Sequence, residues 1–156
     1  MTASTRAVEL ASIAAKAADR MKGEDVIVLD VSAPVVITDA FVLVSADNER
    51  LVNAIVDEVE QDLREVDAKP VRREGVREGR WALLDYGDIV VHVFRDEERD
   101  FYGLDRLWRD CPRIEVEGLE QAAVPADDAP GADAARQARS IDDIPLAAQG
   151  PDAGEF

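Results

Sequence analysis

The chain has 156 residues, of which 47% are hydrophobic and only 5% aromatic, so we expect one domain whose core is mostly Val, Leu, Ile and Ala. Its 34 acidic and 18 basic residues give a net charge of −16, which disfavours bare nucleic acid, because that binding needs Lys and Arg to neutralise phosphates. A single cysteine excludes an internal disulfide, and no apolar run approaches the ~18 residues of a membrane span, so we expect a cytoplasmic protein without membrane partners.

The first third of the chain predicts one helix and two strands. Residues 5–22 are alanine-rich and should form a helix that ends at Gly23. Its predicted apolar stripe is Leu10, Ile13, Ala14, Ala17 and Met21. Residues 26–31 form an apolar run typical of a strand buried on both faces, and a turn at 32–34 separates it from a second strand at 37–45.

A second helix is predicted at residues 49–66, capped by Asp47 and Asn48. Its buried stripe is Val52, Ile55, Val56, Val59, Leu63 and Val66, and its acidic face is Asp57, Glu58, Glu60, Asp62 and Glu65. We expect that acidic face to contact water. The connection at 71–80 holds the one locally basic patch, Arg72, Arg73, Arg77 and Arg80. A partner-binding loop and a solvated loop or hairpin explain it equally well.

Residues 80–110 contain both tryptophans, both tyrosines and the single histidine. A strand at 81–85 and an alternating strand at 88–95 flank Tyr86-Gly87, which predicts a tight hairpin, because glycine accepts a positive φ. Asp96 should cap the next helix. The apolar side of that helix is predicted to be Phe101, Leu104, Leu107, Trp108 and Cys111.

The chain after this helix changes in composition. Residues 113–117 alternate and predict a short final strand. Residues 118–156 hold eight acidic residues, two arginines and a single aromatic, and we expect them to form a disordered acidic tail. The predicted domain therefore spans residues 1–117. Its element order, α-β-β-α-β-β-α-β, favours an α/β fold with a mixed β-sheet covered by helices.

The central stretch resembles a known family signature. The matching residues are Trp81, the run Asp85-Tyr86-Gly87-Asp88, the run Val90-Val91-His92-Val93-Phe94, Arg99, Phe101-Tyr102, Leu104-Asp105 and Leu107-Trp108. Thr38-Asp39 followed by an apolar strand matches as well. In this order and spacing, over roughly residues 6–117, the chain resembles the bacterial ribosomal silencing factors, the Iojap family.

The resemblance implies a fold similar to the nucleotidyltransferase core, and a function. A factor of this family would bind the large ribosomal subunit through its fourteenth ribosomal protein and block joining of the small subunit. Translation would then be silenced under nutrient limitation. This steric role implies no cofactor, no metal and little direct RNA contact, and a homodimer off the ribosome is compatible with it.

An enzymatic alternative follows from the implied fold. A metal-dependent nucleotidyltransferase would use Asp85, Asp88 and His92 as its metal or acid–base residues. Such enzymes need a Gly-Ser turn after their first strand, whereas this chain has Ser45-Ala46-Asp47 and no glycine. One histidine and two carboxylates flanking a turn fit a capped turn and a half-buried histidine better.

The predicted partner-binding residues are Arg80, Trp81, Tyr86 and His92. Trp, Tyr and Arg are the residues most often found as interface anchors, and the family's partner surface is carried on the matching positions. We expect Tyr86 to be exposed because it lies in a turn, whereas periodicity leaves Trp81 undecided. Phe101 and Trp108 lie on the predicted helical stripe, which favours core packing.

Overall fold

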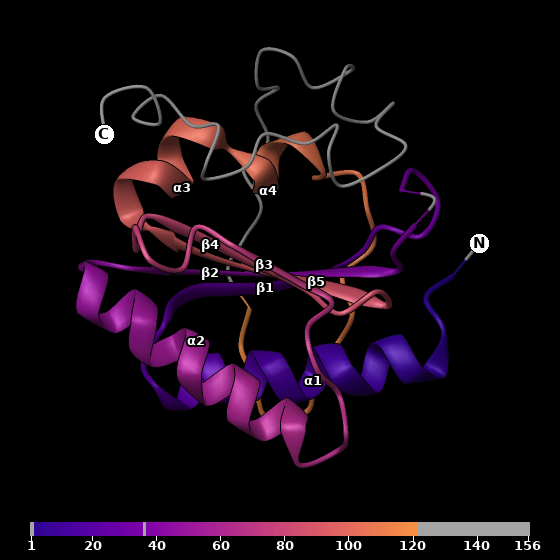
Figure 1. Cartoon of the computed structure of the whole chain (residues 1–156). Coiled ribbons are helices and arrows are strands. Elements are labelled where there is room, and N and C mark those ends of the chain that lie inside the picture. The colour runs from indigo at the N-terminus through magenta and orange to yellow at the C-terminus, as the bar shows by residue number, and fades with distance from the viewer. Residues whose placement is uncertain (1, 36, 122–156) are drawn as a thin grey trace.

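A computed structural model describes residues 2–35 and 37–121 (Figure 1). The elements in chain order are α1 (Thr5–Arg20), β1 (Glu24–Asp30), β2 (Ala40–Ala46), α2 (Glu49–Arg64), β3 (Arg72–Glu74), β4 (Trp81–Asp85), β5 (Ile89–Arg95), α3 (Asp96–Tyr102) and α4 (Leu104–Leu107). They form a mixed five-stranded sheet with helices, so the predicted α/β class is confirmed. Within the described residues, no helix is long and apolar enough to cross a membrane.

The strands of this sheet lie in the order β1-β2-β5-β4-β3. The two central strands, β2 and β5, run parallel, and Val42 lies opposite Val91. The other neighbours are antiparallel. The second strand was predicted to begin at residue 37, but β2 begins at Ala40. Just before it, the N–H of Asp39 donates to the carbonyl of Asp88 and the carbonyl of Asp39 accepts from the N–H of Val31. Ile37 lies outside the strand and is 49% exposed.

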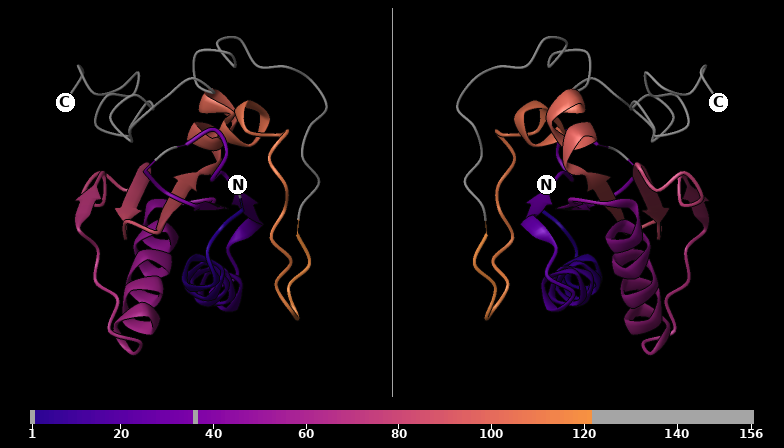
Figure 2. Two further views of the ribbon diagram at one scale, coloured as in Figure 1. Left: turned by 90° about the vertical axis from the view of Figure 1, so that its right-hand side faces the viewer. Right: turned by 90° about the vertical axis from the view of Figure 1, so that its left-hand side faces the viewer.

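The helices lie in two layers, one on each face of the sheet (Figures 1 and 2). α1 and α2 pack on the face that lies below the sheet in Figure 1, where their apolar residues join Val42, Val44 and Val91 in the larger core. α3 and α4 lie above the sheet, where Phe41, Trp81, Phe94, Leu107 and Trp108 belong to a second core. We call these two faces the α1–α2 face and the α3–α4 face.

Alanines dominate the buried side of α1. Its buried residues are Ala7, Leu10, Ala11, Ala14, Ala15, Ala17 and Ala18, whereas Ile13 and Met21, from the predicted stripe, are only half-buried. Small side chains let the helix lie close to the sheet and to α2. The helix ends at Arg20 rather than at residue 22, because Lys22 adopts a positive φ of 65°. The N–H of Gly23 then donates to the carbonyl of Ala18.

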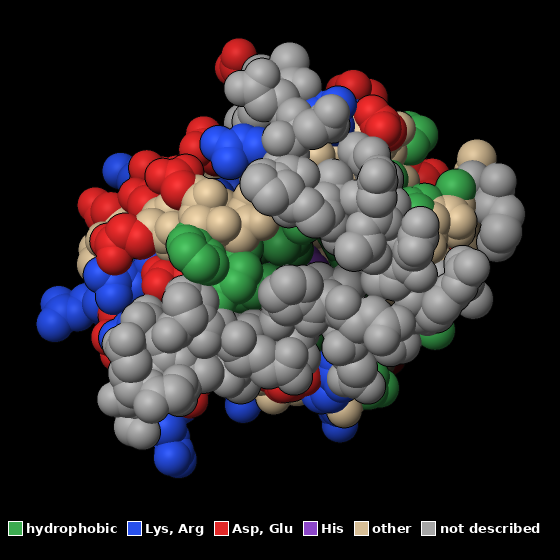
Figure 3. Space-filling model, turned by 90° about the horizontal axis from the view of Figure 1, so that it is seen from above, with side chains coloured by type: hydrophobic (Ala, Val, Ile, Leu, Met, Phe, Trp, Pro, Cys, Tyr) green, Lys and Arg blue, Asp and Glu red, His purple; other side chains and the backbone are tan. Residues whose placement is uncertain are grey.

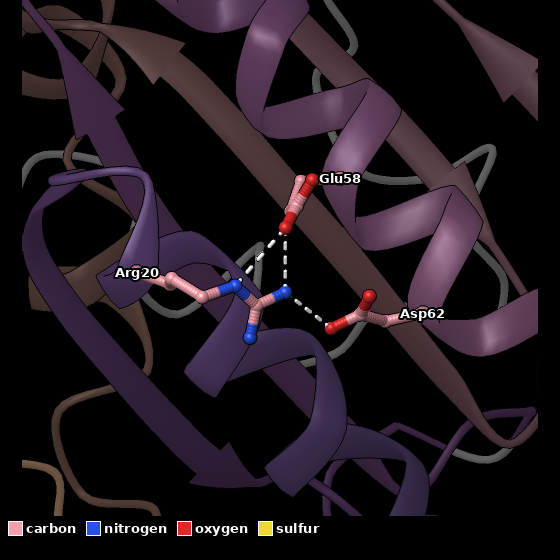
Figure 4. Close-up of polar contacts among 3 residues, drawn as sticks. All are labelled: Arg20, Glu58 and Asp62. Atoms are coloured by element: carbon pink, nitrogen blue, oxygen red, sulfur yellow. Dashed lines mark hydrogen bonds and ion pairs between the residues drawn. The ribbon is translucent and has the colours of Figure 1, made fainter.

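The acidic face of α2 is only partly solvated. Nη2 of Arg20, at the end of α1, lies 2.6 Å from Oε2 of Glu58 and 2.6 Å from Oδ2 of Asp62 (Figure 4). Arg73 pairs with Glu60 at 2.7 Å. Only Asp57 and Glu65 are exposed as predicted. Asn48 caps α2 by accepting from the N–H of Leu51, and the helix ends at Arg64, two residues before the predicted end.

Two short helices replace the single helix predicted after β5. Gly103 takes a left-handed conformation, with φ 59°, and separates α3 from α4. Asp96 does not cap α3: the N-cap is Arg95, and no side chain accepts a hydrogen bond there. Asp96, Glu97 and Glu98 do lie in the first turn of α3, where negative charge is favoured.

Residues 112–121, here called the edge segment, run along the outer edge of β1. The N–H of Asp30 donates to the carbonyl of Pro112 at 2.8 Å, and the N–H of Ile114 donates to the carbonyl of Val28 at 2.9 Å. The N–H of Val28 donates to the side-chain oxygen of Gln121 at 2.9 Å. The strand predicted at 113–117 is therefore reduced to one bridge between Leu29 and Arg113. The next backbone donor of β1, the N–H of Val28, bonds to the side chain of Gln121 instead of to a strand.

The edge segment continues four residues past the domain boundary predicted at residue 117. Leu119 packs against the α1–α2 core, and the amide nitrogen of Gln121 donates to the carbonyl of Ile114 at 2.7 Å. We predict that a chain ending at Gln121 keeps the urea unfolding midpoint of the full chain, because the composition after it supports no core. A chain ending at Glu117 should lose about 1–3 kcal/mol. Equal midpoints for the two truncated chains would contradict a stabilising role of residues 118–121.

Candidate functional site

The β4–β5 hairpin positions three of the four predicted partner-binding residues on different faces of the sheet. Trp81 and His92 point to the α3–α4 face, whereas Tyr86 belongs to the α1–α2 core. The cause is the alternation of side chains along a strand, since Trp81 and Tyr86 are an odd number of residues apart. One partner surface therefore cannot be centred on both rings.

Trp81 and His92 form a buried hydrogen-bonded pair. Both residues are 0% exposed, and the indole N–H of Trp81 donates to Nδ1 of His92 at 3.1 Å. The imidazole is then neutral and carries its proton on Nε2, which has no hydrogen-bond partner among the described residues. Burial, and to a lesser extent the nearby charge of Arg99, lower the pKa of His92 to about 3.

The exposure predicted for Tyr86 is wrong. Its residue surface is only 8% exposed, and its hydroxyl has no hydrogen-bond partner within the described part of the chain. Burial, and then the charge of Glu60 on α2, raise the pKa of the phenol. The turn itself forms as predicted: Gly87 has φ 82°, and the N–H of Tyr86 donates to the carbonyl of Ile89 at 2.9 Å. Tyr86 precedes the tip of the turn and packs inward.

A chain of aromatic rings leads from the buried pair to the surface. The ring centroid of Tyr102 lies 4.4 Å from that of Trp81, and Phe101 meets Tyr102 edge-on at 5.1 Å. Phe101 was expected in the core, but it is 67% exposed, because the break at Gly103 ends the helical register that would have buried it. Trp108 is fully buried, as predicted, and meets Phe41 at 5.8 Å.

Arg80 lies at the start of β4 and is half-exposed. The basic connection that precedes it is not a loop throughout, because Arg72–Glu74 forms β3 and pairs with β4 at the edge of the sheet. A charged three-residue edge strand discourages further strand pairing. Arg72 pairs with Glu74 at 3.0 Å, so part of this positive charge is compensated within the chain.

The three residues of the enzymatic alternative do not converge. Asp88 is exposed at the turn, His92 is fully buried, and Oδ1 of Asp85 accepts from the N–H of Gly87 at 2.8 Å. Across residues 2–35 and 37–121, no three His, Cys, Asp or Glu side chains are grouped so that they could hold a metal ion. The carboxylate of Asp85 instead shapes the turn, as expected for the capped-turn interpretation.

One polar site, near the carboxyl ends of β2 and β5, was not predicted from the sequence. Arg99 is only 7% exposed and donates a long hydrogen bond, 3.4 Å, to the hydroxyl of Ser45. It lines a cavity of about 250 Å³ with Glu24, Asp25, Ser45, Asp96 and Asp100. Burial and the neighbouring Asp96 raise the pKa of Glu24. Arg99 belongs to the family pattern, but its burial was not predicted, because an arginine on a helix usually faces water.

Comparison with known proteins identifies relatives over most of the chain. The family described as "Ribosomal silencing factor during starvation" matches residues 4–141. Ribosomal silencing factor RsfS of Halalkalibacterium halodurans is 39% identical over 111 residues, which are 71% of this chain and 95% of that protein. The RsfS of Bacillus subtilis is 36% identical over 110 residues, covering 70% and 93%. The chloroplastic protein Iojap of Zea mays is 33% identical over 65% of this chain and 44% of its own length.

Solved structures agree with these sequence matches. A crystal structure from Chromobacterium violaceum has a TM-score of 0.63 at 31% identity, and the match covers 76% of this chain and 93% of that one. A crystal structure from Bacillus halodurans has a TM-score of 0.61 at 36% identity, covering 69% and 98%. The same α/β fold is therefore present in both.

Proposed function

Because the chain belongs to the family of ribosomal silencing factors, we propose that it represses translation by binding the large ribosomal subunit and blocking the small subunit from joining it. The observation that carries this proposal is the family match across residues 4–141. The family resemblance points to the fourteenth ribosomal protein as the docking partner. Blocking a subunit interface is steric occlusion, which needs a folded surface but no catalytic residue.

The charge of the chain supports a protein partner rather than RNA. A net charge of −16 repels phosphates, whereas it accelerates encounter with a basic protein at low ionic strength. We therefore propose little direct RNA contact and action in the cytoplasm, where ribosomes work.

Within this function, we place the partner contact on the α3–α4 face, next to the start of β4. Arg80 is half-exposed there and can contact a partner directly. Trp81 and His92 lie beneath this surface, where they hold Tyr102 in place. Tyr86 packs on the opposite face, so we propose for it a role in seating α2 against the hairpin.

Sedimentation with separated subunits tests the function. We predict that the purified chain co-sediments with the large subunit and not with the small one, and that it lowers the yield of joined ribosomes. Recovery with both subunits alike, or with naked ribosomal RNA, would contradict the proposal. A matched control is the same chain unfolded in urea and diluted only at the gradient step, which reports nonspecific pelleting.

The enzymatic alternative has a separate test. A labelled nucleoside triphosphate with Mg²⁺ should give no incorporation in the presence of the parent chain. Incorporation that is lost in Asp88→Asn would overturn the steric proposal.

A further inference from the structure

Phe101 is an exposed aromatic side chain at the end of a series of ring contacts. Among the described residues, three large hydrophobic side chains are exposed: Ile37, Val71 and Phe101. Of these three, Phe101 contacts another aromatic ring. Its ring centroid lies 5.1 Å from that of Tyr102, and the Tyr102 centroid lies 4.4 Å from that of the fully buried Trp81. An exposed aromatic ring beside other aromatic side chains offers the apolar area that is typical of an interface anchor.

Three carboxylate side chains lie close to this residue along α3. Glu97 and Glu98 precede Phe101 by four and three residues, so they lie on the same side of α3. Glu97 and Asp100 are exposed, and the contact of Glu97 with Arg95 is long, 3.6 Å. Figure 3 shows Asp and Glu side chains on the α3 side of the molecule, with Lys and Arg side chains among them and hydrophobic side chains beside them. We call Glu97, Glu98, Asp100 and Phe101 the aromatic–acidic patch.

We propose that the aromatic–acidic patch binds an arginine- or lysine-bearing segment of a basic protein, with one cationic side chain lying over the ring of Phe101. A cation over an aromatic face is attracted by the ring quadrupole, and Glu97 is placed to pair with the same charge. The exposed ring adds the apolar area that an ion pair alone lacks. This inference rests on the proposed function, which supplies a basic ribosomal protein as the partner.

Two other occupants fit the patch less well. An RNA backbone would place phosphates against three carboxylates, which is repulsive. A two-fold dimer centred on this patch would bring the same carboxylates of both copies together, because residues at a two-fold axis meet their own copies. Charge complementarity therefore selects a cationic protein segment.

The test is the affinity of Phe101→Ala for purified large ribosomal subunits. Because the side chain is exposed, the unfolding midpoint should stay unchanged, while binding should weaken about thirtyfold or more. Phe101→Trp should retain binding, because indole offers a stronger cation–π face. Val71→Ala is the matched control: this side chain is 75% exposed, precedes β3 and lies outside the patch, so it should bind like the parent.

The outcomes separate this inference from the function on which it rests. If the parent chain fails to bind large subunits, the proposed function is wrong and this inference fails with it. If the parent binds and Phe101→Ala binds equally well, the function stands and the aromatic–acidic patch is not the contact. Glu97→Lys should weaken binding to large subunits and reduce the salt dependence of that binding. In a separate measurement, tighter binding to naked ribosomal RNA by the parent than by Phe101→Ala would show an RNA contact and overturn the inference.

Discussion

Replacement of Trp81 by alanine is expected to destabilise the fold by about 3–5 kcal/mol. The side chain is 0% exposed and packs against Phe94, at 5.0 Å, and Tyr102, at 4.4 Å, so its removal leaves a cavity between the sheet and α3. The Nδ1 acceptor of His92 also loses its donor. A loss of this size should lower the melting temperature by about 10 °C or more, measured by circular dichroism.

Two Trp→Phe variants separate packing from hydrogen bonding. Trp81 and Trp108 are both fully buried, but Nε1 of Trp108 has no hydrogen-bond partner among the described residues. Trp81→Phe and Trp108→Phe remove similar volume, and only the first leaves a buried acceptor unsatisfied. We expect Trp81→Phe to be the more destabilising by about 1–2 kcal/mol. Equal losses would show that the Trp81–His92 hydrogen bond adds nothing to stability.

This destabilisation changes how a binding defect in a Trp81 variant is interpreted. A weaker complex could follow from displacement of Tyr102, which packs on the indole, and of Phe101, which contacts Tyr102, without any contact between Trp81 and the partner. Affinities of Trp81 variants are therefore informative only at temperatures where the variant is fully folded.

Acid should destabilise the protein through His92 well above the pH at which carboxylates titrate. The buried imidazole has a pKa of about 3 in the folded chain, whereas an unfolded histidine has a pKa near 6.5. Between these values the unfolded state binds a proton that the folded state does not. Stability is therefore unaffected by this group above pH 6.5 and falls by about 1.4 kcal/mol per pH unit below it.

At pH 5 the contribution of His92 should amount to a loss of about 2 kcal/mol relative to pH 7.5. Urea unfolding of the parent and of His92→Gln at both pH values measures it, because glutamine can accept from Trp81 but does not titrate. The parent should lose about 2 kcal/mol more than the variant. Since the chain has one histidine, its imidazole resonances can also be followed directly, and a folded-state pKa near 6.5 would contradict the burial argument.

The sequence predicted the centre of the sheet well because periodicity reports burial there. β4 has the predicted bounds, and the alternation along residues 88–95 correctly separated Ile89, Val91 and Val93 from Val90, His92 and Phe94. The alternation of side chains along the hairpin also indicates which face of the sheet Tyr86 lies on. The five-residue separation from Trp81 places the two rings on opposite faces, whereas the predicted exposure of Tyr86 followed from its position in a turn.

Other features depend on tertiary contacts that no local pattern contains. The helical spacing from Phe101 to Cys111 was sound as a pattern, but Gly103 divides the segment, and the first part then presents Phe101 outward. The end of the predicted strand at 113–117 depends on Gln121, whose side chain reaches the N–H of Val28. The partner-binding role of Arg80, Trp81, Tyr86 and His92 stays a prediction.

The parallel pairing of β2 with β5 has a consequence during synthesis of the chain. These strands are neighbours at the centre of the sheet, but residues 47–88 separate them in sequence. At about 5–20 residues per second, β2 leaves the peptidyl-transferase centre roughly 2–10 s before β5 is complete. For that interval one edge of a mostly apolar strand has no native neighbour. The chain is therefore exposed to aggregation while it is still attached to the ribosome that makes it.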